Sequence, residues 1–199
     1  DVQELTAECR QLADGSLIWR KLLKRQVGKV EMHGKNSHAS PSPLVAGDRV
    51  YVHFGPHYTG CLNAADGQVV WETAVNYKPQ HGTGGSPALH EGRLIICCDG
   101  KDQQFTVALD ATSGRELWRT PRDTQPTKGF SFSTPLIVQI GNRWQAICPG
   151  SEAVFAYDPA TGSEIWRCRY PGGYSVVPRP IYAGGLIIVC TGYDRPRVL

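Results

Sequence analysis

Short apolar stretches alternate with turn-forming residues along almost the whole chain. None of these stretches is long, and each is bounded by Gly, Pro, Asn, Asp or Ser, which is typical of β-strands joined by tight turns. One region shows the pattern clearly, because a Gly-Asp step separates its first two apolar stretches, as expected for a β-hairpin. The strands predicted there are 43–46, 49–54, 60–63 and 68–75, with turns at 47–48 and 64–67.

This four-strand pattern recurs, marked by a Gly that precedes a Trp by four residues. Successive Trp residues are separated by 52, 47 and 48 positions, close to the length of one β-propeller blade. Gly adopts the positive φ that a tight hairpin needs, and a buried Trp gives each sheet a large apolar surface to pack on its neighbour. The structural pairs are Gly15 with Trp19, Gly67 with Trp71, Gly114 with Trp118, and Gly162 with Trp166.

A second mark keeps the same period. Pro43, Pro87, Pro135 and Pro180 each open an apolar stretch, and they recur at steps of 44, 48 and 45 residues. Two independent motifs therefore predict stacked sheets of one kind.

The segment from Ser16 to Val27 has apolar residues near a helical period, with Lys and Arg between them. Taken alone it would be predicted as a helix. Because Trp19 aligns with three Trp residues in predicted strands, we expect a strand over 16–22. The conformation of the residues from there to Val30 stays open.

The sequences LDATSGRELW at 109–118 and YDPATGSEIW at 157–166 resemble the tryptophan-docking repeat of the quinoprotein-like β-propellers. The resemblance implies an all-β protein, a β-propeller of four-stranded antiparallel blades. The family includes pyrroloquinoline quinone (PQQ) dehydrogenases. It also includes non-catalytic members, such as the lipoprotein of the outer-membrane β-barrel assembly machinery, to which we expect this chain to be closest in character.

The whole chain, 1–199, is expected to be one segment of such a propeller, with about four blades' worth of sheet. Family members usually close a ring of seven or eight blades. A segment of a longer propeller is therefore the favoured arrangement, but two copies closing an eight-bladed ring and one copy closing a four-bladed ring remain open. The predicted parts are a partial blade at 4–23, blades at 40–77, 84–120 and 131–169, and a partial blade at 176–199.

Composition narrows the range of functions. The 21 Lys and Arg against 18 Asp and Glu give a net charge of +3, spread over many segments, so no nucleic-acid partner is expected. The longest apolar runs, at 94–98 and 186–190, are far shorter than the ~20 residues of a membrane span, so a membrane link is expected only through flanking sequence. Nucleophile-elbow, Walker and dinucleotide motifs are not found, so a hydrolase or nucleotide-dependent enzyme is not expected.

In a propeller, the loop before each innermost strand and the loop between its second and third strands lie on one face. Polar side chains of both signs occur in these loops, and together they would hold an anionic or polar ligand. The histidines do not show the spacing of a zinc site, so no metal is expected. The predicted binding residues are His38, His57, Lys101, Asp102, Arg179, Asp194 and Arg195.

The seven cysteines mostly occupy equivalent strand positions of the repeat, which indicates small buried residues. The sequence Cys97-Cys98-Asp99 is similar to the adjacent-cysteine disulfide that lies beside the quinone in quinoprotein alcohol dehydrogenases. Here, however, the pair lies within a predicted strand, where neighbouring side chains point to opposite faces. A redox role for this adjacent pair is therefore not expected.

The sequence thus favours a non-catalytic binding or scaffolding propeller that acts on a protein or peptide partner, without a cofactor. Two alternatives remain: a part of a PQQ- and calcium-dependent dehydrogenase, and the sensor domain of a larger kinase-linked protein. Because quinoprotein-like propellers are mostly exported, we expect a periplasmic or extracellular location.

Overall fold

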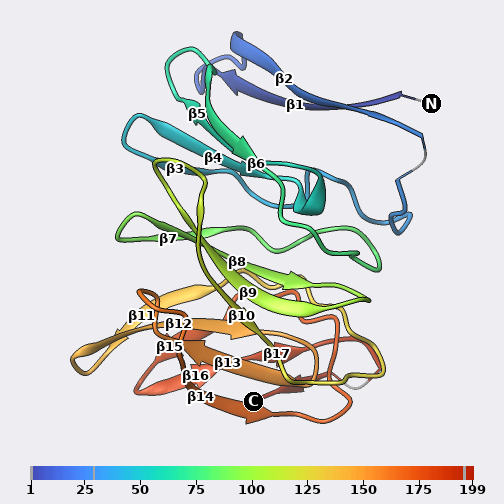
Figure 1. Ribbon diagram of the computed structural model, residues 1–199, viewed down its shortest axis with the longest axis vertical. Coiled ribbons are helices and arrows are strands. Elements are labelled where there is room, and N and C mark those ends of the chain that lie inside the picture. The colour runs from blue at the N-terminus through green and yellow to red at the C-terminus, as the bar shows by residue number, and fades with distance from the viewer. Residues whose placement is uncertain (1, 29, 195) are drawn as a thin grey trace.

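The computed structural model describes residues 2–28, 30–194 and 196–199, and its regular structure is almost entirely β (Figure 1). Within these ranges the only helical element is one 3₁₀ turn, η1 (Gly55–His57). No helix in this part of the chain has the length and hydropathy to cross a membrane.

Three complete four-stranded antiparallel sheets form the centre of the molecule, and each strand pairs with the next in sequence. We call these sheets blades 1, 2 and 3. Blade 1 consists of β3 (Leu44–Ala46), β4 (Arg49–His53), β5 (Thr59–Asn63) and β6 (Val69–Thr73). Blade 2 consists of β7 (Ala88–His90), β8 (Arg93–Asp99), β9 (Gln104–Asp110) and β10 (Glu116–Pro121). Blade 3 consists of β11 (Leu136–Ile140), β12 (Arg143–Pro149), β13 (Ala153–Tyr157) and β14 (Glu164–Arg169).

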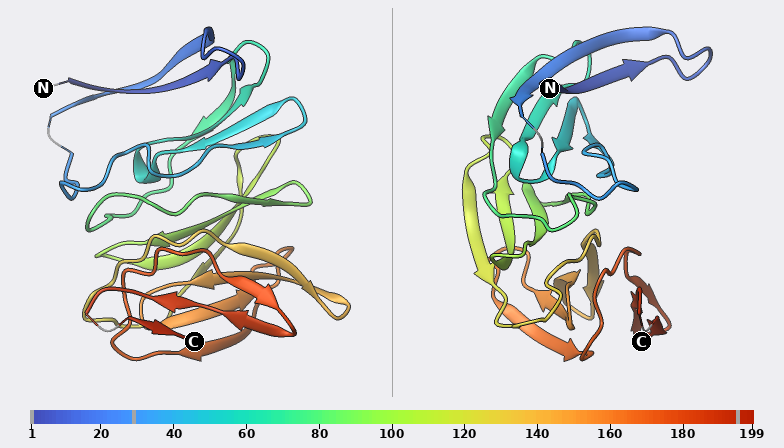
Figure 2. Two further views of the ribbon diagram at one scale, coloured as in Figure 1. Left: turned by 180° about the vertical axis from the view of Figure 1, so that it is seen from behind. Right: turned by 90° about the vertical axis from the view of Figure 1, so that its right-hand side faces the viewer.

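Two-stranded sheets flank the three blades. At the N-terminal side, β1 (Val2–Arg10) pairs with β2 (Leu17–Val27). At the C-terminal side, β15 (Ile181–Ala183) pairs with β16 (Leu186–Ile188), and β17 (Cys190–Thr191) pairs with β18 (Arg197–Val198). The sheets follow one another around an arc, as the two views of Figure 2 show. This architecture confirms the predicted all-β fold built from four-stranded antiparallel blades.

The strand expected over 16–22 is confirmed, and it continues to Val27. Leu5 faces Lys24 while Thr6 faces Leu22, so Leu23 is an extra residue in β2. Such a bulge shifts the alternation of faces within the strand. The burial pattern shifts accordingly, because Trp19, Lys21 and Leu23 are half-buried and the next buried residue is Gln26.

Each interface between neighbouring sheets has its own apolar core. The cluster between blades 1 and 2 includes Trp71, Leu94, Ile96 and Phe105, all buried. Similar clusters lie between the β1–β2 hairpin and blade 1, between blades 2 and 3, and between blade 3 and the C-terminal strands. The sheets are therefore held face to face by burial of apolar surface, as the repeat predicted.

The repeated Gly and Trp residues connect one sheet to the next. The indole N–H of Trp71 in blade 1 donates a hydrogen bond of 2.9 Å to the carbonyl of Ala111, in the turn of blade 2. Its ring covers Gly114, where a Cβ atom would lie 2.4 Å from the indole. The equivalent contacts join Trp19 to Gly67 and Trp118 to Gly162.

Trp166 makes a different contact, because its N–H donates to the side-chain oxygen of Gln145 at 2.8 Å. Gln145 belongs to β12 of the same blade. The indole N–H is thus satisfied within blade 3, and Trp166 still packs against the apolar cluster that joins blade 3 to the C-terminal strands.

Candidate functional site

Loops from successive sheets come together at one end of the blades. The loops before the innermost strands contact the loops between second and third strands, as the propeller arrangement predicts. Lys101 N donates to the carbonyl of Lys78 at 2.8 Å, and Ser151 Oγ donates to that of Phe130 at 2.9 Å. Neighbouring loops are also joined to each other, because Ser175 N donates to the Phe130 carbonyl at 2.9 Å.

These loops surround a cavity of about 780 Å³, which we call the loop cavity. This volume lies within the range of small-molecule and peptide side-chain pockets. Amide and hydroxyl groups such as those of Asn36, Gln80 and Ser86 line it between aromatic side chains. The aromatic and imidazole residues of the lining are His33, His81, Phe130, Phe132, Tyr174 and Tyr193.

The aromatic residues form a continuous wall across the loops. Ring centroids are 5.4 Å apart for His33 and His81, 4.6 Å for His81 and Phe130, and 5.3 Å for Phe130 and Tyr174. Tyr193 extends the wall, with its ring 6.3 Å from that of Tyr174. Most of these pairs are edge-to-face, the arrangement that the ring quadrupole favours. The wall therefore presents both ring faces and ring edges to the cavity.

Lys35 and Lys128 are the lysines among the residues that line the loop cavity, and Lys128 is paired with a carboxylate. Lys128 Nζ lies 2.8 Å from the Asp194 carboxylate and donates to the Tyr174 hydroxyl, also at 2.8 Å. The ammonium lies 4.3 Å from the centre of the Tyr174 ring. These partners, Asp194 first, raise the pKa of Lys128 to about 12, so it stays protonated. Partial burial and the neighbouring His33 lower the pKa of His81, which favours a neutral imidazole that both donates and accepts.

Two of the predicted binding residues pack against each other instead of lining the loop cavity. His38 and His57 form an edge-to-face pair with centroids 5.4 Å apart, and His38 is buried. Loss of hydration lowers the pKa of each. Their imidazoles join the loop before β3 to η1.

Charged residues of the predicted set are mostly paired with other charges or with the backbone. Lys101 pairs with Glu31 at 3.3 Å, and Asp102 accepts a hydrogen bond from Lys78 N at 2.8 Å. Asp194 reaches the loop cavity through its bond to Lys128. Arg195 lies outside the described residues.

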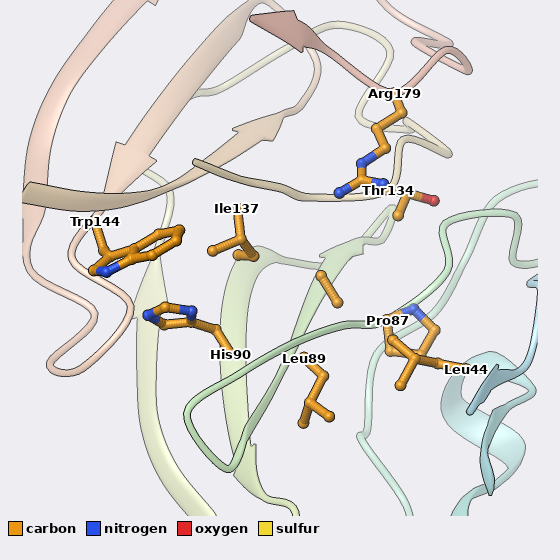
Figure 3. Close-up of a pocket in the computed structure, with 9 residues that line it drawn as sticks. Leu44, Pro87, Leu89, His90, Thr134, Ile137, Trp144 and Arg179 are labelled. Atoms are coloured by element: carbon orange, nitrogen blue, oxygen red, sulfur yellow. The ribbon is translucent and has the colours of Figure 1, made fainter. Parts of the chain in front are cut away.

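The remaining predicted residue, Arg179, lines a second and smaller cavity of about 360 Å³ along the innermost strands (Figure 3). Leu89 and Ile137 lie in its wall, and His90 packs against Trp144 at a centroid distance of 4.5 Å. Thr134 lines both cavities, so they adjoin.

None of the predicted residues that the structure describes is among those that line the loop cavity. The lining residues that the prediction missed include His33, Phe130 and Tyr174. The signal for them was present, because aromatic residues recur in the Gly- and Ser-rich loops before the innermost strands. Loop aromatics that repeat with the blade period were therefore the better guide.

The adjacent cysteines lie away from the loop cavity. Cys98 is fully buried in the core between blades 1 and 2, whereas Cys97 packs on the core between blades 2 and 3. The two side chains point to opposite faces of β8, as the sequence predicted. In the described part of the chain, no three His, Cys, Asp or Glu residues are grouped so that they could hold a metal ion.

A protein-family model described as "Outer membrane protein assembly factor BamB" matches residues 6–198. The chain belongs to this PQQ-type β-propeller family. The match extends from β1 to β18 and so includes every sheet of the structure.

Curated relatives of this PQQ-type propeller include two polyvinylalcohol dehydrogenases. The one from Pseudomonas sp is 27% identical over 144 residues, covering 53% of this chain and 22% of the relative. The one from Sphingopyxis sp. (strain 113P3) is 30% identical over 186 residues, covering 78% of this chain and 27% of the relative. The chain therefore spans about a quarter of the length of these relatives.

Solved structures share the fold at low sequence identity. BamB from Moraxella catarrhalis matches with a TM-score of 0.62 and 16% identity, over 94% of this chain and 54% of that one. Quinohemoprotein alcohol dehydrogenase from Comamonas testosteroni matches with a TM-score of 0.59 and 15% identity, over 94% of this chain and 37% of that one. Both catalytic and assembly proteins thus have this fold, and the fold alone does not fix the function.

Proposed function

We propose that this propeller segment is a non-catalytic binding module whose loop cavity takes an extended peptide of a protein partner. The observation that carries the proposal is the composition of the cavity wall. Aromatic faces and edges alternate there with neutral amide and hydroxyl groups, and the ammonium of Lys128 is already paired with Asp194.

A peptide suits this wall for physical reasons. Its backbone offers N–H and C=O groups to the side chains of Gln80 and Ser86, and its side chains would cover the rings of Phe130 and Tyr174. Aromatic residues dominate the energetics of such contacts, because they bury large areas with few rotatable bonds. The proposed setting is periplasmic or extracellular, as for exported proteins of this type.

Panning of a random peptide library on the purified chain tests the proposal. Selected peptides should bind the wild-type chain and bind about tenfold more weakly to Tyr193→Ala and His33→Ala, since each variant removes a ring from the wall. Both side chains are accessible, and Tyr193 is 77% exposed, so the fold should tolerate their loss. Tyr182→Ala, on β15 outside the cavity, is the matched control.

Two outcomes would contradict this proposal. One is that no peptide is enriched on the folded chain. The other is that enriched peptides bind the two cavity variants and the control equally well, which would place the contact elsewhere.

A second candidate function is a part of a PQQ- and calcium-dependent dehydrogenase. It is favoured by the two similar polyvinylalcohol dehydrogenases. The residues here do not fit the adjacent-cysteine arrangement of the quinoprotein alcohol dehydrogenases, since Cys97 and Cys98 pack into separate cores. Gel filtration of the chain with pyrroloquinoline quinone and calcium distinguishes the two candidates, because co-eluting quinone absorbance would favour the dehydrogenase.

A further inference from the structure

A buried polar cluster lies between blades 2 and 3, apart from the loop cavity. At its centre, Arg122 Nη1 donates to Asp99 Oδ1 at 2.5 Å, and both side chains are 1% exposed. Arg122 Nη2 also donates to Thr106 Oγ1 at 3.1 Å. Removing such an ion pair from water costs free energy.

Two thiols lie beside this ion pair. Cys97, on β8 of blade 2, packs against the cluster that contains Cys148, on β12 of blade 3. Alternate residues of β8 face opposite sides, and the side that holds Ile95 and Cys97 faces blade 3. The side that holds Ile96 and Cys98 faces blade 1. Cys97 therefore faces Cys148 across the interface, and its sequence neighbour faces away.

The two thiols differ in accessibility and in acidity. Cys97 is partly exposed, whereas Cys148 has no exposed surface. A hydrogen bond with the Cys148 thiol, followed by the positive charge of Arg122, lowers the pKa of Cys97 against the effect of its own burial. Burial raises the pKa of Cys148. Because a thiolate is the reactive form, Cys97 is the thiol that an external reagent meets first.

We infer that Cys97 and Cys148 are a redox-active pair that forms a disulfide joining blades 2 and 3. The geometry that supports this inference is that one accessible and one buried thiol face each other across a packed interface, next to the guanidinium of Arg122. This proposal does not depend on the ligand of the loop cavity. All seven cysteines are free thiols in the structure.

The oxidant in this proposal is a small disulfide such as oxidised glutathione. The Cys97 thiolate attacks one sulfur of the oxidant, so that a mixed disulfide forms and one glutathione thiolate leaves. The Cys148 sulfur then attacks Cys97 Sγ, its proton passes to the second glutathione sulfur, and that glutathione leaves as a thiol. Two protein thiols thus lose two protons and two electrons, and one oxidised glutathione becomes two reduced glutathiones.

Peptide mapping of the native chain after oxidation tests the inference. The chain is incubated with oxidised glutathione, blocked with N-ethylmaleimide and digested with trypsin without reduction. Cleavage places Cys97 and Cys98 in peptide 94–101 and Cys148 in peptide 144–167. We expect these two peptides to be linked in the wild type and in Cys98→Ala, and the link to be lost in Cys97→Ala and Cys148→Ala.

Cys98→Ala is the decisive variant, because it keeps the proposed pair and removes the adjacent cysteine. A link between Cys97 and Cys98 within peptide 94–101 would overturn the inference. So would loss of the link in folded Cys98→Ala, or thiols that stay free in the native wild-type chain after complete oxidation of the exposed Cys168. Far-UV circular dichroism establishes that each variant is folded.

Urea unfolding gives a second readout. A disulfide between 97 and 148 restricts the unfolded chain, so oxidation should raise the urea midpoint of the wild type and of Cys98→Ala. The midpoint of Cys148→Ala should not rise. If the link is present but the oxidised and reduced wild type have equal midpoints, the disulfide does not join blades 2 and 3 in the native state, and the inference is overturned.

Discussion

Substitution of Gly114 by Ala should destabilise the protein through a contact between two blades. Gly114 lies in the turn before β10, with φ of +72°, and an added Cβ would lie 2.4 Å from the Trp71 ring of blade 1. The ring is itself fixed by the hydrogen bond from its N–H to Ala111 O. The new methyl group therefore has to displace the indole or the turn.

Gly92→Ala is a matched control within the same blade. Gly92 has nearly the same backbone conformation, with φ of +73°, but no atom lies within 4 Å of the position of its Cβ. Both substitutions cost about 1–2 kcal/mol, because an L-residue is disfavoured in this left-handed conformation. Only Gly114→Ala adds the cost of overpacking, about 1–3 kcal/mol. We therefore expect a loss of about 1–2 kcal/mol for Gly92→Ala and about 2–5 kcal/mol for Gly114→Ala.

Urea unfolding followed by tryptophan fluorescence and by circular dichroism measures this difference. Both probes should give the same midpoint, and the slope of the free energy with urea should be the same for the two variants, so that midpoints can be compared as stabilities. The fluorescence of native Gly114→Ala should also change, since the Trp71 ring moves, whereas that of native Gly92→Ala should not.

Equal losses of stability for the two variants, within about 0.5 kcal/mol, would refute this explanation. The docking of Trp71 over the turn would then contribute nothing beyond the conformational preference of Gly. A larger loss for Gly92→Ala would refute it more strongly, because that position has space for a methyl group.

Two further predictions concern buried polar groups. Asp99→Asn or Arg122→Met should each lower the free energy of unfolding in urea by about 3–5 kcal/mol, because each leaves the other member of the buried pair without its charge partner. A double variant that loses as much stability as the two single variants together would contradict this. Burial lowers the pKa of His53 to about 4 in the folded state, against about 6.5 when unfolded, so the unfolded chain binds more protons between these values. The contribution of neutral His53 to the free energy of unfolding should therefore be fully present above pH 6.5, and stability should fall by up to about 3 kcal/mol as the pH is lowered to 4. The variant His53→Gln, which keeps a polar group next to Thr59, should remove most of this pH dependence.

The blade architecture was predictable from the sequence because each blade carries the same local requirements. A Gly in the turn and a Trp four residues later recur in every repeat, since the turn needs positive φ and the next sheet needs an apolar surface to pack on. Trp71 and Gly114 thus appear in the sequence as members of two repeats. Tertiary structure shows that they contact each other, with the Trp of one blade lying on the Gly of the next.

The candidate site was less accessible to sequence analysis. The face of the molecule was predictable, because loop positions follow from the strand order. The residues that line the loop cavity were not, since charged side chains such as Lys101 and Glu31 pair with each other and are not part of its lining. Aromatic residues such as Phe130 and Tyr174 form the wall.

By itself the sequence determined the repeat, the strands within it and the orientation of Cys97 and Cys98 on opposite faces of β8. Only the tertiary structure decided that Cys97 faces Cys148 and that Arg122 pairs with Asp99. Strand alternation is a local rule that each segment obeys alone. The partner of a side chain across two blades depends on how far one sheet is shifted and rotated against the next, and the packing of both whole sheets sets that shift.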